Sequence, residues 1–332
     1  MKVIKPIKVT ETNWYAVNFN QMSDYAAWNS GVAYPVGTIR CYLPTKSQYK
    51  CIIATNAGED PEAFPTKWAR IGSMQIWRPF DGFISQSPAT VLGSSTFDAT
   101  GLGLWAFPGL ISQKANKFTF SLTGLGAFDT VAVLATDCSQ VRAYFYDQNG
   151  TKQTDLTIRA LDDTQIVDAW DYCFGDLTYR RDFVFEGFDG WGSTNLSQLY
   201  IEISYDALTT FEAPIGIGEI VVGQSRELGR CHSDAKIQLV DYSKKNIDEY
   251  GTVTIVQRAY SQNASFEIEI ATVDRNRVQA LITSLRATPC VYYPTAGDAN
   301  QGIAIYGYVK DYNTTYATPD RAYAALEVEG MI

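Results

Sequence analysis

Apolar and polar residues alternate with a period of two along much of the chain, which is the pattern of half-buried β-strands. In the middle third, the alternation is clearest at Phe118–Leu122, Val141–Tyr146 and Leu199–Tyr205. Turn-forming residues separate these segments, and Asp147 to Gly150 gives the best hairpin signal in the chain. Short strands at regular spacing predict a β-sandwich, which we expect to be jelly-roll-like, over about residues 83–225.

The last third combines the same alternation with one helical period. Four apolar residues recur at the spacing of a helix that begins near Thr272–Asp274 with capping residues and ends before Pro289. A helix packed on an antiparallel sheet predicts an α+β domain over about residues 226–332. The apolar helix positions are Val278, Leu281, Ile282 and Leu285, and the expected half-buried strands are Ile237–Leu239, Val253–Ile255, Phe266–Ile270, Ile303–Tyr308 and Leu326–Val328.

The first 82 residues carry a series of aromatic and turn residues. Large rings supply apolar area that short strands otherwise lack, so this series predicts a very small β domain. With 332 residues, the chain is long enough for three domains, at 1–82, 83–225 and 226–332, and we expect a mostly β protein. The series comprises Trp28, Tyr34, Gly37, Tyr49, Asn56, Gly58, Asp60, Pro61, Trp68, Gly72, Trp77 and Phe80.

This N-terminal pattern resembles the small chitin- and cellulose-binding modules attached to many polysaccharidases. Two interpretations follow. The rings form a compact core, or some of them lie on the surface and stack on sugar rings, for which Tyr34, Tyr49 and Trp68 are the candidates. Many such modules carry an exposed tryptophan where this chain has the aliphatic pair Ile52 and Ile53. An aliphatic pair in place of an exposed tryptophan favours a role in docking over contact with a sugar.

Composition narrows the range of partners. Aromatic residues make up 13% of the chain and charged residues 19%, and the formal net charge is -9. This balance argues against nucleic acid, which requires clustered lysine and arginine. No apolar run is long enough to span a membrane, and the first residues lack the apolar core of a secretory signal. We therefore expect neither membrane insertion nor secretion, and synthesis in the cytoplasm.

The residue types that hold metals and cofactors are sparse. The six cysteines have no metal-ligand spacing, and buried thiols are the default expectation, with a Cys41–Cys51 disulfide left open. The single histidine, His232, follows Cys231 directly, and neighbours on a strand point to opposite faces. We therefore predict no metal site, no cofactor and no histidine-dependent nucleophile.

An acidic and aromatic stretch around Trp170 is the one candidate for catalysis. A glycoside hydrolase needs two carboxylates facing each other across a groove. The same mixture suits a sugar groove, a calcium-binding loop, or a sandwich edge with rings inward and acids in water. We favour the sandwich edge, because no pair of carboxylates stands out. We predict no catalytic residue and no enzyme. The acids are Asp162, Asp163, Asp168, Asp171 and Asp182.

Over its whole length, the chain resembles structural proteins of the tail tip or baseplate of tailed bacteriophages. The resemblance lies in the order of motifs in all three predicted domains. In the first they are Asp24-Tyr-Ala-Ala-Trp28, Tyr34 to Gly37, Asn56 to Pro61 and Trp68 to Asp81. In the second they are Ile166 to Tyr172 and Gly216 to Gly223, and in the third Val240 to Lys245, Leu285 to Cys290, Tyr306 to Asp311 and Leu326 to Gly330.

The resemblance implies a non-enzymatic virion component, made in the host cytoplasm, that assembles as a symmetric homo-oligomer and docks other tail proteins or fibres. It implies a contribution to host attachment, with a host surface glycan as a further partner. Abundant tyrosine and few charges suit such interfaces. The alternative is a carbohydrate-active protein, either a capsule depolymerase or a sugar-binding adhesin.

Overall fold

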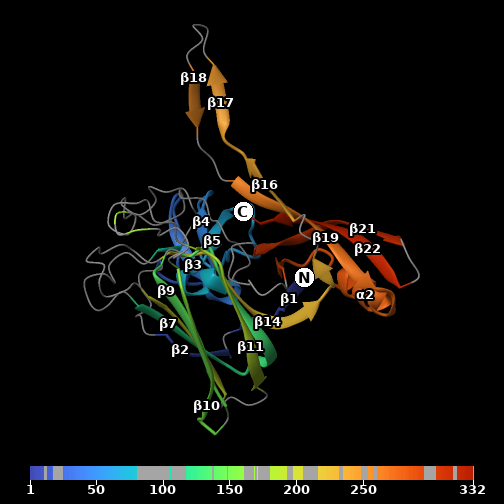
Figure 1. The fold of residues 1–332 in the computed structure, drawn as a ribbon. Helices are drawn as coiled ribbons and strands as arrows, with labels where there is room; N and C mark the ends of the chain where they lie inside the picture. The colour runs from blue at the N-terminus through green and yellow to red at the C-terminus, as the bar shows by residue number, and fades with distance from the viewer. Residues whose placement is uncertain are drawn as a thin grey trace.

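The computed structural model describes most of the chain and shows a mostly β protein. A large antiparallel sheet curls into a half-barrel, smaller antiparallel sheets accompany it, and a helix lies near the C-terminal region (Figure 1). The described residues are 1–10, 13–17, 25–80, 105–106, 117–136, 138–147, 149–160, 168, 170, 180–192, 197–204, 216–231, 235–247, 253–256, 260–294, 304–316 and 320–331.

The large sheet draws its strands from distant parts of the chain. Its strands run in the order β11-β8-β14-β1-β20-β21-β22-β19-β15, and β16 also pairs with β19. They are β1 (Lys2–Pro6), β8 (Gly126–Leu134), β11 (Phe183–Gly192), β14 (Glu219–Glu227), β15 (Arg230–Cys231), β16 (Lys236–Asp241), β19 (Tyr260–Ala271), β20 (Cys290–Tyr293), β21 (Ile305–Tyr316) and β22 (Arg321–Gly330).

Strand β1 lies inside this sheet and joins its two halves. Ile4 faces Ser225 of β14 on one side and Val291 of β20 on the other. The side chains of Val3 and Ile4 are fully buried, on opposite faces of the strand. The first strand of the predicted N-terminal domain therefore pairs with strands of the other two predicted segments. The domain limits stay a prediction.

A second sheet packs against one part of the large sheet. Its order is β10-β9-β12-β7-β2, and its inward side chains form one core with those of β8, β11 and β14. The predicted alternation and the hairpin between β9 and β10 are confirmed, and the Asp147 N–H bonds the Thr151 carbonyl across the turn at 2.9 Å. The strands are β2 (Trp14–Val17), β7 (Lys117–Thr123), β9 (Gln140–Tyr146), β10 (Lys152–Arg159) and β12 (Gln198–Ser204).

The predicted C-terminal helix is confirmed as α2 (Arg275–Ser284), which follows the 3₁₀ turn η6 (Thr272–Asp274). Val278, Ile282 and Leu285 are buried in a core shared with the large sheet. The expected capping by a side chain is absent at Asp274, whose carboxylate instead pairs with the Arg277 guanidinium at 3.1 Å. Packing of the apolar face is therefore what holds this short helix in place.

Within the predicted small N-terminal domain, a three-stranded sheet in the order β3-β4-β5 is made of Ile39–Tyr42, Ser47–Cys51 and Trp68–Ser73. A 3₁₀ turn, η2 (Leu43–Thr45), joins β3 to β4, and a second, η3 (Gln75–Phe80), follows β5. The short strands β6 (Trp105–Ala106) and β13 (Gly216–Ile217) pair with each other.

A hairpin arm projects from the body of the protein (Figure 1). It continues β16 and the start of β19 outward as β17 (Lys244–Ile247) and β18 (Val253–Val256), which pair with each other and with no other described strand. The strands at Ile237–Leu239 and Val253–Ile255 were expected to be half-buried, but their apolar side chains are exposed. No described element covers this part of the hairpin.

The tight approach of β14 to β1 yields the first testable prediction. A Cβ on Gly223 would lie 2.0 Å from the Lys5 carbonyl oxygen, so Gly223→Ala must push two central strands apart. We expect the free energy of unfolding to fall by ~1–3 kcal/mol, the usual cost of overpacking. Urea unfolding measures this, and Gly31→Ala is the control because its nearest atom would lie at 3.4 Å. Equal stabilities of the two variants would contradict the prediction.

Candidate functional site

Two of the three predicted sugar-stacking residues lie in the core of the small domain. Tyr34 is 4% exposed and Trp68 is 2% exposed, and both pack with Cys51. Their ring centroids are 5.6 Å apart at an interplanar angle of 67°. The indole N–H of Trp68 donates to the Glu59 carbonyl at 3.1 Å. The interpretation of these two rings as a compact core is therefore confirmed.

Tyr49, the third candidate, is half-buried at the edge of that cluster. Its ring meets Tyr42 edge-on, with centroids 6.3 Å apart, and its hydroxyl lies 3.3 Å from the Thr45 hydroxyl. Sugar binding by Tyr34, Tyr49 and Trp68 stays a prediction. The burial of Tyr34 and Trp68 does not favour it, because stacking needs an open ring face.

The aliphatic pair after β4 is more accessible than these rings. Ile52 and Ile53 are both exposed, and so are Val36 and Phe64 of the same domain. Docking through these exposed side chains, and with it the role of the small domain as an attachment module, stays a prediction.

Cys41 and Cys51 lie on neighbouring strands but form no disulfide. The register places Cys41 opposite Gln48, three positions before Cys51. The Cys51 thiol instead donates to the Ile53 carbonyl at 3.0 Å. Three strand positions correspond to ~10 Å, beyond the reach of a disulfide without backbone movement.

We expect both thiols to stay reduced in the purified protein, because the register keeps them apart. Iodoacetamide added to protein denatured without reductant should alkylate Cys41 and Cys51 alike, as read by peptide mass spectrometry. Recovery of a disulfide-linked pair of peptides containing both residues would contradict the register.

The acidic stretch around Trp170 is described only in part. The Asp168 carboxylate accepts the Trp170 N–H at 2.8 Å, and the Trp170 side chain is 68% exposed. The Asp182 carboxylate accepts the Ala135 N–H at 2.9 Å, and burial raises the pKa of Asp182. Asp162, Asp163, Asp171 and His232 lie outside the described residues. Over the ranges that are described, no three His, Cys, Asp or Glu side chains gather as a metal site.

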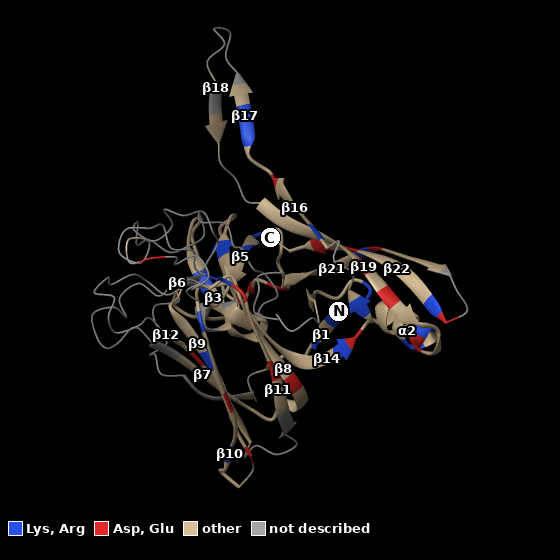
Figure 2. Cartoon of the chain, in the orientation of Figure 1, with Lys and Arg blue, Asp and Glu red and all other residues tan. Residues whose placement is uncertain are grey.

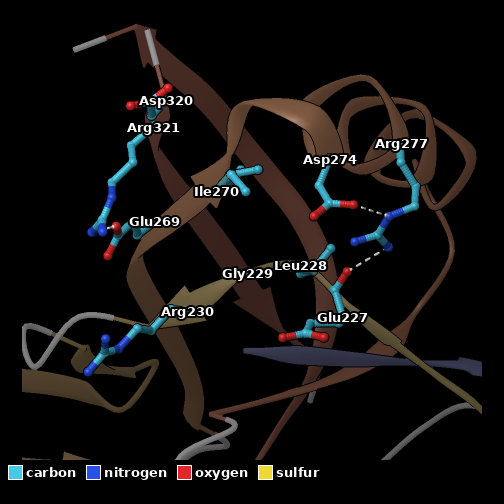
Figure 3. A pocket seen from close by; sticks show the side chains of 11 residues that line it. Glu227, Leu228, Gly229, Arg230, Glu269, Ile270, Asp274, Arg277, Asp320 and Arg321 are labelled. Carbon is cyan, nitrogen blue, oxygen red and sulfur yellow. Dashed lines mark hydrogen bonds and ion pairs between the residues drawn. The ribbon is translucent and has the colours of Figure 1, made fainter. Parts of the chain in front are cut away.

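An open pocket of about 370 Å³ lies where the end of β14 and β15 meet β19 and the start of α2 (Figure 3). Its charges are largely satisfied internally: Arg321 pairs with Glu269, and the Arg277 guanidinium binds Asp274 and the Glu227 carbonyl. The lining residues come from three segments that lie far apart in the sequence, so no local pattern indicates this pocket. Its mixed charges single out no ligand.

A cluster of tyrosines occupies the outward face of the second sheet. The register aligns Tyr144 of β9 with Tyr200 of β12, and Tyr146 lies one outward position further along β9. The rings of Tyr144 and Tyr200 stack with centroids 4.9 Å apart and planes 6° apart. The Tyr146 ring is nearly perpendicular to both, at 5.8 and 5.7 Å. We call these three residues the tyrosine face.

Charged side chains surround the tyrosine face. The Arg142 guanidinium makes two hydrogen bonds to Asp155, at 2.7 and 2.6 Å, and Lys152 pairs with the same carboxylate. This pairing lowers the pKa of Asp155. The Tyr144 hydroxyl donates to Glu202 at 2.8 Å, and burial together with that bond raises the pKa of Tyr144. One feature of the sequence could have indicated the tyrosine face. The spacing Tyr144-x-Tyr146 places two tyrosines at outward positions of an alternating strand, where polar residues are normal.

Seven of the sixteen exposed large apolar side chains of the described residues lie on the arm and its base. Leu239 is 59% exposed and Ile255 69%. On β17, Lys245 lies opposite Ile255 and Lys244 opposite Val256, where Figure 2 shows the basic part of the arm. The exposed large apolar residues are Ile237, Leu239, Tyr242, Val253, Ile255, Val256 and Tyr260, and we call them the arm surface.

Comparison with known proteins gives no further assignment, since no family model and no curated protein matches the chain. Within the described ranges, no helix is both long and apolar enough to cross a membrane.

Proposed function

We propose that the protein is a non-enzymatic structural component of a bacteriophage tail, at the tail tip or baseplate. It assembles as a symmetric homo-oligomer and docks other tail proteins or fibres. The motif order in the sequence motivates the assignment to a tail, and the hairpin arm is the observation that supports assembly.

The arm needs a partner for physical reasons. A two-stranded hairpin in water is marginally stable by itself, and among the strands that the structure describes β17 and β18 have only each other as partners. On β18, the arm-surface residues Val253, Ile255 and Val256 are exposed, and on β17 the lysines Lys244 and Lys245 are exposed. Exposed apolar side chains gathered on one projecting element are a feature of protein interfaces. An arm that packs on a neighbouring subunit buries the arm surface and gains the order that the hairpin alone lacks.

A second copy of the chain is the partner that this proposal names for the arm. Homo-oligomers close by symmetry, so every subunit offers the same arm and receives one from a neighbour. The exposed apolar residues of the small domain, among them Ile52 and Ile53, then remain for other tail components. The same proposal includes three finer points of the fold. They are the jelly-roll-like topology of the middle segment, the three domain limits and the α+β assignment of the last segment.

Two measurements test this proposal. Light scattering at micromolar concentration should give a mass that is a multiple of the monomer, and a monomeric mass would remove self-assembly. Mass spectrometry of purified phage particles should find the protein in the virion, and its absence would remove the structural role. The location of the gene beside tail-assembly genes is the quickest supporting observation.

A further inference from the structure

We propose that the tyrosine face binds neutral hexose or N-acetylhexosamine units of a polysaccharide. This binding can be tested on the isolated protein. Only the location of the polysaccharide, on the host surface, rests on the proposed tail function. The site is distinct from Tyr34, Tyr49 and Trp68 of the small domain.

The fold itself does not require these rings. Val141, Ala143 and Phe145 already fill the inward positions of β9, and they are fully or almost fully buried in the core between the two sheets. The outward positions of such a strand are usually polar. Three partly exposed tyrosines on adjacent outward positions are therefore surplus to the core.

Tyrosine rings are suited to sugars because they combine a flat apolar surface with a polar edge. The C–H groups on one face of a pyranose pack on such a surface. Stacking fixes Tyr144 against Tyr200, and Tyr146 meets both rings edge-on. The Arg142 and Lys152 cations lie over the Tyr144 ring, at 5.0 and 4.7 Å from its centroid, so this ring is held between them and Tyr200 and acts as a support. Tyr146 and Tyr200 are then the rings that contact the sugar, and because their packing fixes them, little conformational entropy is lost on binding.

Polar groups at the edge of the platform match sugar hydroxyls. The Glu202 carboxylate accepts the Tyr144 hydroxyl, and the Gln198 side-chain carbonyl accepts the Tyr200 hydroxyl. These acceptors and hydroxyls are held in place before any ligand arrives. Sites of this kind fix a ligand with a few positioned polar groups beside apolar surface.

The surrounding charges favour a neutral sugar over other ligands. Lys152 pairs with Asp155, and Arg142 pairs with Asp155 and lies 3.7 Å from Glu202, so neither of these described cations beside the rings is free to bind an anionic polymer. Nucleic acid meets the same obstacle. An apolar protein surface would have to desolvate the Arg142–Asp155–Lys152 cluster, at a high cost. Binding of a neutral glycan requires neither an unpaired cation nor desolvation of this charged cluster.

A glycan array tests the proposal directly. The probes are neutral bacterial polysaccharides and oligosaccharides of hexose and N-acetylhexosamine, presented to the full-length protein. We expect wild type to bind at least one of them. We expect Tyr146→Ala and Tyr200→Ala to weaken that binding by about tenfold or more, as for a ring at the centre of an interface. The control is Tyr323→Ala, which removes an exposed tyrosine from β22.

Conservative variants separate binding from folding. Tyr146→Leu keeps apolar bulk but removes the flat ring, so binding should fall while the circular dichroism spectrum is unchanged. Tyr200→Phe keeps the ring and should retain most of the binding. No bound glycan on the array, or equal binding by wild type and Tyr146→Leu, would overturn the proposal. Glycan binding by a protein absent from virions would overturn the tail function and leave this site standing.

Discussion

Ile255→Asp is expected to convert the assembled protein into monomers. The side chain is 69% exposed in the single chain, so the substitution leaves the fold intact. In the assembly that we propose, the same position is buried, where an unpaired carboxylate is strongly unfavourable. Central apolar contacts of an interface often contribute ~2 kcal/mol or more, so we expect the dissociation constant to rise by about thirtyfold or more.

Multi-angle light scattering across a dilution series measures this change. The matched control is Val273→Asp, which places the same charge on a side chain that is 90% exposed in η6, away from the arm. Wild type and Val273→Asp should share one mass, and Ile255→Asp should give a lower one. The role of the arm is refuted if Ile255→Asp and wild type have equal masses at every concentration.

Ile4→Ala is expected to cause the largest loss of stability of a single substitution. Ile4 is fully buried among side chains of β8, β11, β14 and β20, in the core on one face of the large sheet. Removing a buried isoleucine side chain to alanine leaves a cavity and costs ~2–5 kcal/mol. Because β1 holds β14 and β20 together, this loss affects both halves of the sheet.

Urea unfolding followed by circular dichroism gives the free energy of unfolding for this comparison. Lys5→Ala is the control on the same strand, since its side chain is exposed and its loss should change stability little. Similar midpoints for Ile4→Ala and Lys5→Ala would show that β1 adds little to the sheet. The two predictions differ in kind, since Ile255→Asp alters assembly and Ile4→Ala alters folding.

Local pattern was sufficient to predict most strands and the helix. The alternation in β9 and β12, the turn from Asp147 to Gly150 and the apolar spacing of α2 all depend on neighbours in the sequence. Pairing between distant strands leaves no such local signal. The position of β1 between β14 and β20 could therefore not be predicted from the residues alone.

Burial in the arm shows a second limit of sequence reasoning. The apolar positions Val253 and Ile255 have the period of a half-buried strand, and that period is the same whether the cover comes from this chain or from another. The tyrosine face shows the converse. Tyr144 and Tyr146 were recognised as part of a strand, but only the register with Tyr200 reveals that the rings gather on one outward face.

The central place of β1 has a consequence for how the protein is made. Translation delivers Lys2–Pro6 before both of its partners, Glu219–Glu227 and Cys290–Tyr293. Until those segments leave the ribosome, β1 has open hydrogen-bonding edges and two unburied apolar side chains. Pairing between such distant segments folds slowly and exposes aggregation-prone edges meanwhile. A ribosome-bound chain that stops before β20 should therefore recruit chaperones and resist compaction, however well its second sheet has formed.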